Sequence, residues 1–510
     1  MYLSMSGIYK YCMLNDSATA EGKILLLSSS VTKTFEKTMV KKIIICAVVA
    51  FLTMPFGVAC SDKFDEGSND IVIDDDDNNE DNEQEPEIVY PETYAFNHPC
   101  AYVSQADIER VKAKIAEANT ADPVYASWLN FCRNIYAQAP YTPNAVELLV
   151  AGDPKNTGLD ADNSSVCRPD AAAAFQLALR WKISGEEKYA EAAIGILNSW
   201  ASTLKKITAN DNNQYLLCGF QGYTFANAGE LMRDYEGWAA KDFEDFKKWM
   251  VKVWYEKNYW FISTHGGQNN CSLHYWSNWE LCNLMSMMAI GILTEDVEKV
   301  NFVYQQFCEG EGSGCINNMI PYAPVEDPSG KSTGMLAQSM ESGRDQGHGT
   351  LVISLAAEFA QMASNLGLDF FGMHNNKLLA MFEYTAKYNV KVDGRYITTT
   401  MPFTPYTYCG GEQGLCGCNG GRPHDHGRDH TAVSEEGRGK ERPCWDLIYN
   451  HYTKVKGMPE SAVYYTKLFA EQLRYTNGEL TGDGGAGVAR YGMASGTYDQ
   501  LGWGTMLFTR

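Results

Sequence analysis

The 510-residue chain lacks an excess of positive charge: 42 Lys and Arg stand against 63 Asp and Glu, which leaves a formal charge of −21. Nucleic-acid binding needs a basic face for the phosphates, so the composition argues against a nucleic-acid partner. The acidic excess is uneven, because Asp62–Glu87 holds thirteen acidic residues and only Lys63 as a base. The rest of the chain can therefore still hold a local cationic pocket for an anionic ligand.

The sequence also lacks a P-loop, sustained apolar–polar alternation and a repeat of fixed period. The missing repeat argues against a helical solenoid. Apolar residues recur instead with helical spacing, which predicts amphipathic helices near residues 104–118, 171–181, 189–200, 219–236, 242–257, 272–292, 296–308, 346–364, 376–389, 442–455 and 459–474. Such a series of antiparallel helix pairs predicts an all-α fold, an (α/α) toroid or barrel forming one large domain over residues 91–510.

The N-terminal region has the pattern of an export signal. Met39–Lys42 provides a charged start, Ile43–Ala50 an apolar run, and Gly57–Cys60 resembles a bacterial lipobox in which the cysteine is lipidated. We expect residues 1–59 to be a leader with a lipoprotein signal peptide and Cys60 to be the lipidation site. The alternative is a plain secretory signal, with Cys60 an ordinary residue.

Residues 60–90 are too acidic and too poor in apolar residues to fold, which predicts a disordered tether. An acidic stretch behind the lipidated cysteine resembles the surface-export signal of Bacteroidetes lipoproteins. We therefore expect an exported lipoprotein on the outer membrane, at the cell surface or the periplasmic face, that touches the membrane only through its lipid. Disulfides can form there, and twelve cysteines follow Cys60, but the sequence does not give their pairing.

Two polar constellations precede apolar helices. In the first, His274 and Asn278 are four residues apart, which predicts one shared face near a helix N-terminus, where an anion is favoured. In the second, Arg344 and His348 have the same spacing, and Glu341 can hold Arg344 for a carboxylate. The structural alternatives are a capping Asn with a structural His, and an ion-paired helix start.

Two further segments carry polar groups. Tyr449 and Tyr452 are one helical turn apart and are candidates for a cavity, although a core role is the commoner fate of tyrosine. Thr398–Lys440 is expected to form a loop over one mouth of the toroid. Within it, His424, His426 and His430 have a spacing typical of metal ligands. A structural ion in residues 409–430 is one interpretation, and a disulfide-stapled loop with solvated histidines is the favoured one; no cofactor is required.

Several motifs together resemble the alginate-lyase-like family of Bacteroidetes, over roughly residues 95–510, with family 38 of the polysaccharide lyases as the nearest group. The motifs are Glu341–His348, Asn278-Trp279, Gly222-Tyr223 with Asn227-Ala228 and Glu230, Arg442-Pro443 with Asn450-His451-Tyr452, and Tyr498–Gly504. The resemblance implies an α/α toroid that cleaves a uronic-acid polymer, alginate polymannuronate or glucuronan, by β-elimination. It also implies a catalytic Tyr and His, with Asn or Arg at the substrate carboxylate.

The sequence departs from that family in two places. His274 is shifted by one position relative to the Asn-His pair of the better-known members, and Gly347-His348 stands where they have Tyr-His. The catalytic tyrosine must then come from Tyr322, Tyr449 or Tyr452. The full set of candidates is His274, Asn278, Arg344, His348, Tyr322, Tyr449 and Tyr452 for catalysis, and Gln268, Tyr275, Trp276, Tyr223, Glu341 and Asn450 for substrate binding.

In the expected reaction, Asn278, Arg344 and His274 neutralise the uronate carboxylate so that the C5 proton can be removed. A Tyr or His takes that proton, and a Tyr or His protonates the leaving O4. One tyrosine suffices when both groups lie on one face, as in mannuronate, and a cation such as Arg344 would lower its pKa. The alternatives are a glycoside hydrolase using Glu341 with Asp345 or Glu230 with Asp234, and a non-catalytic glycan-binding lipoprotein.

Overall fold

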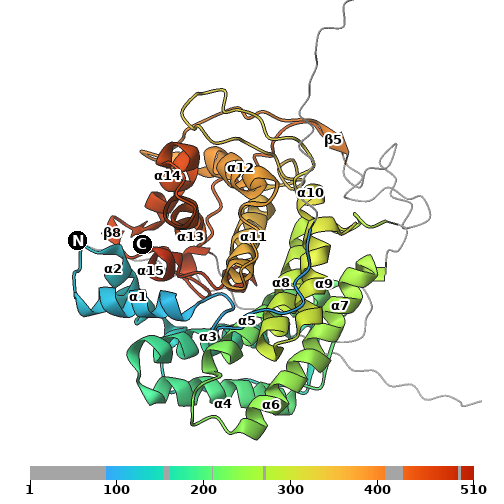
Figure 1. Cartoon of the computed structure of the whole chain (residues 1–510), viewed down its shortest axis with the longest axis vertical. Coiled ribbons are helices and arrows are strands. Elements are labelled where there is room, and N and C mark those ends of the chain that lie inside the picture. Colours follow the sequence, from blue (N-terminus) through green and yellow to red (C-terminus); the bar gives the residue numbers. More distant parts are fainter. Residues whose placement is uncertain (1–87, 153–160, 210, 268–270, 408–428, 492–494) are drawn as a thin grey trace, which may run out of the picture. The chain divides into compact units, whose positions relative to one another are not determined.

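Helices make up most of the part of the chain that the structure describes (Figure 1). The computed structural model describes residues 88–152, 161–209, 211–267, 271–407, 429–491 and 495–510. All of them belong to the unit Glu83–Arg510. The predicted leader 1–59, Cys60 and nearly all of the predicted tether lie outside the described residues.

Five helices form an inner row in which each packs against the next. They are α3 (Cys167–Ser184), α5 (Asn213–Met232), α8 (Ser277–Thr294), α11 (Gln346–Asn365) and α13 (Trp445–Asn450). The intervening helices cover them from outside, namely α4 (Glu187–Thr203), α6 (Ala240–Trp249), α7 (Glu256–Ser263), α9 (Val297–Glu309), α12 (Met373–Asn389) and α14 (Tyr464–Leu473). Because the chain alternates between inner and outer helices, the inner helices run in the same direction and their N-termini lie at one mouth.

The two ends of this unit close the row. The N-terminal helices α1 (Gln105–Ala116) and α2 (Pro123–Phe131) pack against the C-terminal α15 (Gly504–Phe508), which packs on α13, while α1 also packs on α3. Figure 1 shows the blue N-terminal helices beside the red C-terminal ones. The fold is therefore the predicted α/α toroid. The short helix α10 (Ile316–Met319) follows α9.

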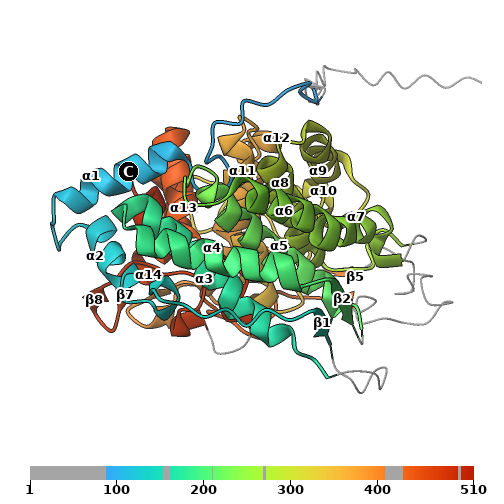
Figure 2. The same cartoon turned by 90° about the horizontal axis from the view of Figure 1, so that it is seen from below.

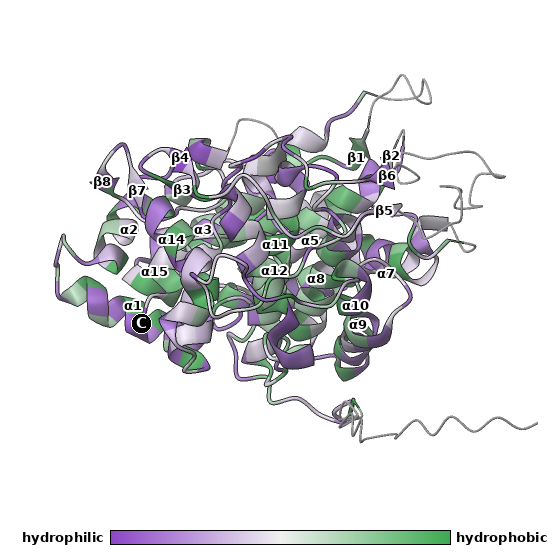
Figure 3. Ribbon diagram, turned by 90° about the horizontal axis from the view of Figure 1, so that it is seen from above, coloured by the Kyte–Doolittle hydropathy of each residue, from purple (hydrophilic) through white to green (hydrophobic). Residues whose placement is uncertain are grey.

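The division into inner and outer helices follows from composition. Helix α8 is apolar on every side, and all of its residues from Leu281 to Leu293 are buried, as expected of a helix surrounded by others. Helix α6 is mostly charged and buries only Phe246 and Trp249, so it has one apolar stripe for the core. Figure 3 shows the apolar residues gathered on the central helices α5, α8 and α11.

Short polar residues fix where helices begin. Ser104 and Asp107 form a reciprocal capping box at the start of α1, and Asp122 caps α2, which has a proline at its first position. Helix α3 ends at Gly185, whose φ of 74° requires the left-handed conformation that glycine adopts freely.

The described residues contain four two-stranded sheets that the sequence analysis did not predict. They are the parallel pair β1 (Leu148–Ala151) and β2 (Lys206–Ala209) and the antiparallel pairs β3 (Lys391–Val392) with β4 (Arg395–Tyr396), β5 (Tyr406–Thr407) with β6 (Asp429–His430), and β7 (Tyr475–Thr476) with β8 (Glu479–Leu480). Strands of two to four residues are too short to give an alternating pattern. Figure 2 shows β1 and β2 near the same end as α7.

One sequence expectation about helices is wrong. The helix predicted from residue 272 begins at Ser277, and His274 lies before it, so His274 and Asn278 do not share a helix face. The helix predicted near residues 346–364 is confirmed, because α11 begins at Gln346 and Arg344 precedes it. Apart from Cys271, the cysteines that the structure describes are free thiols. None of the described helices combines the length and the apolar character needed to cross a membrane.

Candidate active site

Asp345 organises the start of α11. It is the N-cap, and its Oδ1 accepts a hydrogen bond from the backbone N–H of His348 at 2.8 Å. Its Oδ2 lies 2.6 Å from Nδ1 of the His348 imidazole. A carboxylate on Nδ1 assigns the hydrogen of the neutral ring to that nitrogen and leaves the lone pair on Nε2. The His348 side chain is 39% exposed, so this oriented imidazole can reach a ligand.

Electrostatics support an ionised Asp345. Burial by itself would raise the pKa of Asp345, but the hydrogen bonds from His348 and the nearby Arg344 charge outweigh it and lower the pKa. The carboxylate therefore stays negative and holds the imidazole in one orientation. This is the arrangement in which a histidine acts as a general acid or base.

Arg344 is held on three sides. Its guanidinium carbon lies 4.7 Å from the centroid of the Trp276 ring, and its Nη1 lies 3.3 Å from Oε2 of Glu341. Its Nε lies 3.7 Å from Oδ2 of Asp345. The side chain is still 25% exposed. A guanidinium fixed in this way is preorganised to bind a carboxylate.

Glu341 lies beneath Arg344 and is completely buried. Burial raises the pKa of its carboxyl group, although the charges of Arg344 and His348 counteract the effect. Its Oε1 has no hydrogen-bond partner among the described residues. The predicted contact between Glu341 and Arg344 is confirmed, but Glu341 positions the arginine and is too deep to bind substrate itself.

The antiparallel strand pair β5–β6 holds the turn before Arg344. Tyr406 donates its hydroxyl hydrogen to the carbonyl of Met340 and accepts the Gly343 N–H at 3.1 Å. His430 donates from Nδ1 to the Gly343 carbonyl at 2.8 Å. A Cβ on Gly343 would lie 2.5 Å from the Cβ of His430, so only glycine permits this approach.

Aromatic rings connect this strand pair to the rest of the cluster. The His430 ring lies 5.9 Å from Trp276 and 4.9 Å from Tyr406, as measured between centroids. Tyr322 lies 6.2 Å from Tyr406 and is half-buried. Among the three tyrosines predicted for catalysis, Tyr322 alone lies in this cluster.

The pKa of Tyr322 does not follow the sequence expectation. Burial raises the pKa of its hydroxyl, and no neighbouring cation lowers it. The expectation that Arg344 lowers the pKa of the catalytic tyrosine is therefore wrong for Tyr322. At neutral pH the phenol keeps its proton and is suited to give it to a leaving group.

The N-terminus of α8 supplies Trp276 and Asn278. Trp276 is the N-cap residue and carries Arg344 on its ring. Asn278 is 3% exposed, and its Oδ1 has no hydrogen-bond partner among the described residues. A buried amide oxygen without a partner is costly in a folded protein and is often found at a site that binds a ligand.

Two further predicted site residues, His274 and Tyr275, lie in the segment before α8. Tyr275 is buried, accepts a hydrogen bond from Asn212 at 2.5 Å and packs on Phe261 and Trp279. His274 lies in the loop before α8, with its ring 4.7 Å from that of Tyr275. Tyr275 therefore supports the loop, and the structure shows no ion pair or hydrogen bond from His274 to Arg344 within the described residues.

Three predicted site residues belong to the core instead. Tyr452 is fully buried and donates to the carbonyl of Phe371 at 2.8 Å. Tyr449 donates to Glu460 at 2.7 Å, where α13 meets the segment before α14. Asn450 is 2% exposed and donates to the carbonyl of Asp446 at 2.8 Å. These predictions are wrong, because tertiary packing satisfies each of these side chains away from the Arg344 cluster.

Tyr223 is also a core residue. It is fully buried in α5, where its hydroxyl bonds with Glu358 at 3.1 Å and with the carbonyl of Asp499 at 2.9 Å. It cannot touch a polymer, so its prediction as a substrate-binding residue is wrong. Gln268, His424 and His426 lie outside the described residues.

The alternative carboxylate pairs are occupied by cations. Glu341 pairs with Arg344, and Glu230 accepts from Arg233 at 3.2 Å. Asp234 is 65% exposed and pairs with Lys182. These carboxylates are therefore engaged in ion pairs, which argues against their use as the acid–base pair of a glycoside hydrolase.

One group of described residues has atoms placed as metal ligands. His98, Cys100 and Glu230 offer ligand atoms within 4.8 Å of one another. Burial raises the pKa of the Cys100 thiol, and Glu230 accepts from His98 at 2.5 Å and from the Cys100 backbone at 3.0 Å. These bonds tie the segment before α1 to α5, so the group already has a structural role.

The comparisons with known proteins bear on this site. A family model described as alginate lyase matches residues 114–317. This part of the chain is therefore similar to alginate lyases. The match includes Trp276 and Asn278 and ends before Tyr322 and Arg344. No curated protein matches the chain.

Solved alginate lyases are also similar to this chain. An alginate lyase from Bacteroides ovatus is 13% identical, with a TM-score of 0.48, and the match covers 73% of this chain and 96% of that one. Alginate lyase A1-III from Sphingomonas species A1 is 15% identical, with a TM-score of 0.41 and coverages of 57% and 78%. A variant of alginate lyase A1-III complexed with a tetrasaccharide is 14% identical, with a TM-score of 0.41 and coverages of 56% and 76%.

Sequence reasoning missed Tyr406 and underestimated Asp345. Tyr406 reaches the turn before Arg344 from a position 63 residues away from Gly343, and no local pattern signals that contact. Asp345 carries a detectable signal, because an Asp before an apolar helix is a typical N-cap and His348 is three residues later.

Proposed function

We propose that this protein is a lyase that cleaves a uronic-acid polymer such as alginate by β-elimination at the cluster around Arg344. The observation that carries the proposal is the Arg344 guanidinium, fixed between Trp276, Glu341 and Asp345 beside the oriented His348. A lyase of uronates needs a cation for the carboxylate and an acid–base group next to it. Arg344 and His348 supply these two groups, four residues apart in the sequence.

Arg344 binds the carboxylate of the sugar whose C5 proton is removed. Neutralising this charge makes the proton acidic enough to leave, because the negative charge that develops on the carboxylate is stabilised. Asn278 supplies a second polar group from the N-terminus of α8, where the helix dipole also favours negative charge. Arg344 and Asn278 together stabilise the negative charge of the substrate.

His348 and Tyr322 perform the proton transfers. Nε2 of His348 takes the C5 proton, the electron pair left behind forms the C4=C5 double bond, and the C4–O4 bond breaks. Tyr322, which keeps its proton because burial raises its pKa, gives that proton to the departing O4. The products are a new reducing end and an unsaturated uronate at the non-reducing end.

The stereochemistry at C4 and C5 separates the possible substrates. In mannuronate and glucuronate H5 and O4 leave from one face, whereas in guluronate they leave from opposite faces. We propose mannuronate-rich alginate or glucuronan as the substrate, with His348 and Tyr322 approaching from the same side. Polyguluronate should be the slower substrate.

The decisive experiment follows the ultraviolet absorbance of the new C4=C5 bond with polymannuronate, polyguluronate and glucuronan. Elimination raises the absorbance, whereas hydrolysis and binding leave it unchanged. A rise with none of the three polymers would refute the proposal. Faster cleavage of polyguluronate would refute only the one-face geometry.

We also propose that the enzyme is an exported lipoprotein anchored through Cys60, which the lipobox-like Gly57–Cys60 and the acidic segment behind it support. The variant Cys60→Ala should move the enzyme from the membrane fraction to the soluble fraction. Membrane retention of Cys60→Ala equal to that of the unchanged protein would exclude the lipid anchor.

A further inference from the structure

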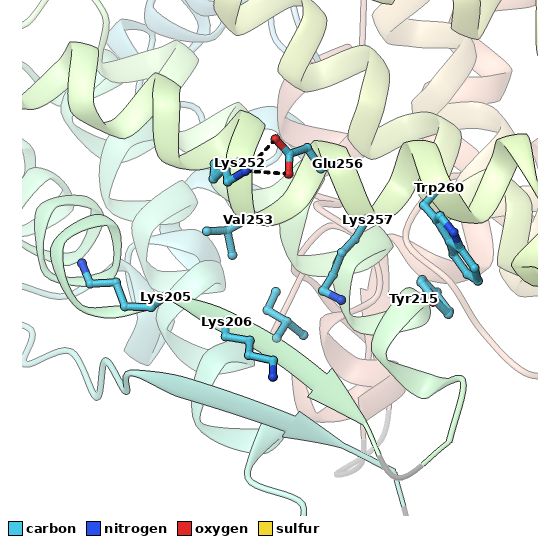
Figure 4. A pocket seen from close by; sticks show the side chains of 9 residues that line it. Lys205, Lys206, Tyr215, Lys252, Val253, Glu256, Lys257 and Trp260 are labelled. Atoms are coloured by element: carbon cyan, nitrogen blue, oxygen red, sulfur yellow. Dashed lines mark hydrogen bonds and ion pairs between the residues drawn. The ribbon is translucent and has the colours of Figure 1, made fainter. Parts of the chain in front are cut away.

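A cationic pocket lies apart from the Arg344 cluster, between β2 and the outer helix α7 (Figure 4). It encloses about 330 Å³, which is within the size range of small-ligand sites. Its lining residues are Lys205, Lys206, Ile207, Tyr215, Lys252, Val253, Glu256, Lys257 and Trp260. We refer to it as the lysine pocket.

The charge of the lysine pocket is opposite to that of the chain. Four lysines and one glutamate line it, which leaves three excess positive charges in a chain of net charge −21. Glu256 pairs with Lys252 at 3.2 Å, and Lys257 donates to the neutral Gln214 at 2.9 Å. In Figure 4, Lys206 and Lys257 extend toward the same space from β2 and α7. An anion placed there would meet two lysines that no carboxylate neutralises in the contacts described.

An aromatic platform borders these lysines. The rings of Tyr215 and Trp260 are stacked, with centroids 5.2 Å apart and planes inclined by 19°. Tyr215 is buried, but Trp260 is 43% exposed, so part of a large apolar ring faces solvent. Exposed aromatic rings beside charged groups are suited to the flat apolar faces of sugar rings.

The lysine pocket is connected to the candidate active site through packed rings. Tyr215 packs on Phe261 with centroids 5.0 Å apart, and Phe261 packs on Tyr275 at 4.9 Å. Tyr275 directly precedes Trp276, which carries Arg344. The lysine pocket therefore lies near the end of the toroid where α5 and α8 begin.

We propose that the lysine pocket binds a second segment of the same polyuronate chain, away from the bond that is cleaved. The lysines recognise the carboxylates, and the Tyr215–Trp260 platform supports the sugar rings. The inference rests on the proposed function, because the ligand is the polymer that the active site cleaves. It predicts that long polymers bind more tightly than short oligosaccharides.

The test compares the double variant Lys206→Ala/Lys257→Ala and the variant Trp260→Ala with the unchanged enzyme. On long polymannuronate the KM should rise roughly 5-fold, because two solvent-accessible charges contribute modestly, while kcat stays the same. On a tetrasaccharide all rates should be unchanged. The control is Lys188→Ala/Lys241→Ala, which removes two exposed lysines that lie outside the lysine pocket.

Two results would overturn the inference. One is an unchanged KM on the long polymer, and the other is an equal loss on polymer and tetrasaccharide, which would make the lysine pocket part of the catalytic cleft. Gel retardation in polymannuronate, measured with the cleavage-impaired Arg344→Ala background, separates binding from catalysis. If the enzyme cleaves no uronate but is retarded through Lys206 and Lys257, only the proposed reaction fails. Equal retardation by polyphosphate or single-stranded DNA would show unspecific charge binding and refute uronate recognition.

Discussion

At the scale of single residues, the chemistry depends on how Arg344 is immobilised. An exposed arginine loses side-chain entropy when it binds a ligand, but here the Trp276 ring, Glu341 and Asp345 have already fixed the guanidinium. Its planar fork can then take both oxygens of a carboxylate. A lysine carries the same charge without the fork and without the stacking surface.

The variant Arg344→Lys should therefore lose kcat/KM by roughly 10²-fold, as for the loss of a preorganised donor to a developing anion. The thermal midpoint should change little, because Lys keeps the charge next to the buried Glu341. Initial rates on polymannuronate give the measurement, with Arg395→Ala on the exposed β4 as the control. A folded Arg344→Lys variant with near-normal kcat/KM would exclude a role for two-point carboxylate binding by the guanidinium group.

The tyrosine assignment gives a second residue-scale prediction. The variant Tyr322→Phe should reduce kcat by at least about 10²-fold and leave substrate binding intact, because only the proton donor is lost. Tyr449→Phe should keep its activity, since its hydroxyl bonds with Glu460. Full activity in Tyr322→Phe would move the acid to another group, and Tyr406→Phe would be the next variant to measure.

At the scale of elements, Asp345 at the start of α11 contacts both the helix backbone and the proposed catalytic histidine. One oxygen of its carboxylate caps α11 and the other orients the His348 ring. Capping and catalysis can be separated, because an amide oxygen still accepts a backbone N–H. The amide cannot offer a second charged acceptor to the imidazole.

The variant Asp345→Asn should keep the thermal midpoint near that of the unchanged enzyme but lower kcat by roughly 10-fold or more, with a shifted pH–rate profile. Asp345→Ala should lose the cap as well, at a cost of about 1 kcal/mol in the free energy of unfolding. Calorimetry and rate profiles measure the two effects. Equal kcat values for Asp345→Asn and the unchanged enzyme would show that Asp345 is only a cap.

At the scale of the whole molecule, buried carboxyl groups make stability depend on pH. Burial raises the pKa of Glu358 to about 7 and that of Glu383 to about 7, against the usual value near 4.5. For each group the folded state holds the proton more tightly than the unfolded state. Stability therefore falls as the pH rises from about 4.5 to about 7, where these buried groups lose their protons.

Asp327 acts in the opposite direction. Although it is buried, hydrogen bonds from Lys387 and Tyr465 lower its pKa below the usual value. Its contribution is therefore present above a pH of about 4 and is lost as the pH falls further. Maximum stability is therefore expected at acidic pH, above the range in which Asp327 is protonated and below the range in which Glu358 and Glu383 lose their protons.

The thermal midpoint should thus fall by on the order of 5 °C from about pH 5.5 to about pH 8. The variant Glu358→Gln removes one of the two titrations and should flatten this decline. Glu479→Gln, at an exposed position on β8, should leave it unchanged. A midpoint that rises with pH over this range would contradict the assignment of neutral buried carboxyl groups.

The sequence by itself determined the features that depend on neighbours along the chain. Apolar spacing and composition predicted the helices and their arrangement in pairs, because the positions of the apolar residues in a helix show whether one face or all faces are buried. The contact between Glu341 and Arg344 was also predictable, since three residues separate them. The helix start after Arg344 was predicted, but the start near His274 was missed, because a polar turn and a first helical turn have similar compositions.

Only the tertiary structure decided which distant residues meet. It placed Trp276 under Arg344, brought Tyr406 and His430 to Gly343, and assigned Tyr322 rather than Tyr449 or Tyr452 to the cluster. It also assembled the lysine pocket from β2 and α7. Such contacts depend on how helices far apart in sequence pack around one core, and no local pattern encodes that packing.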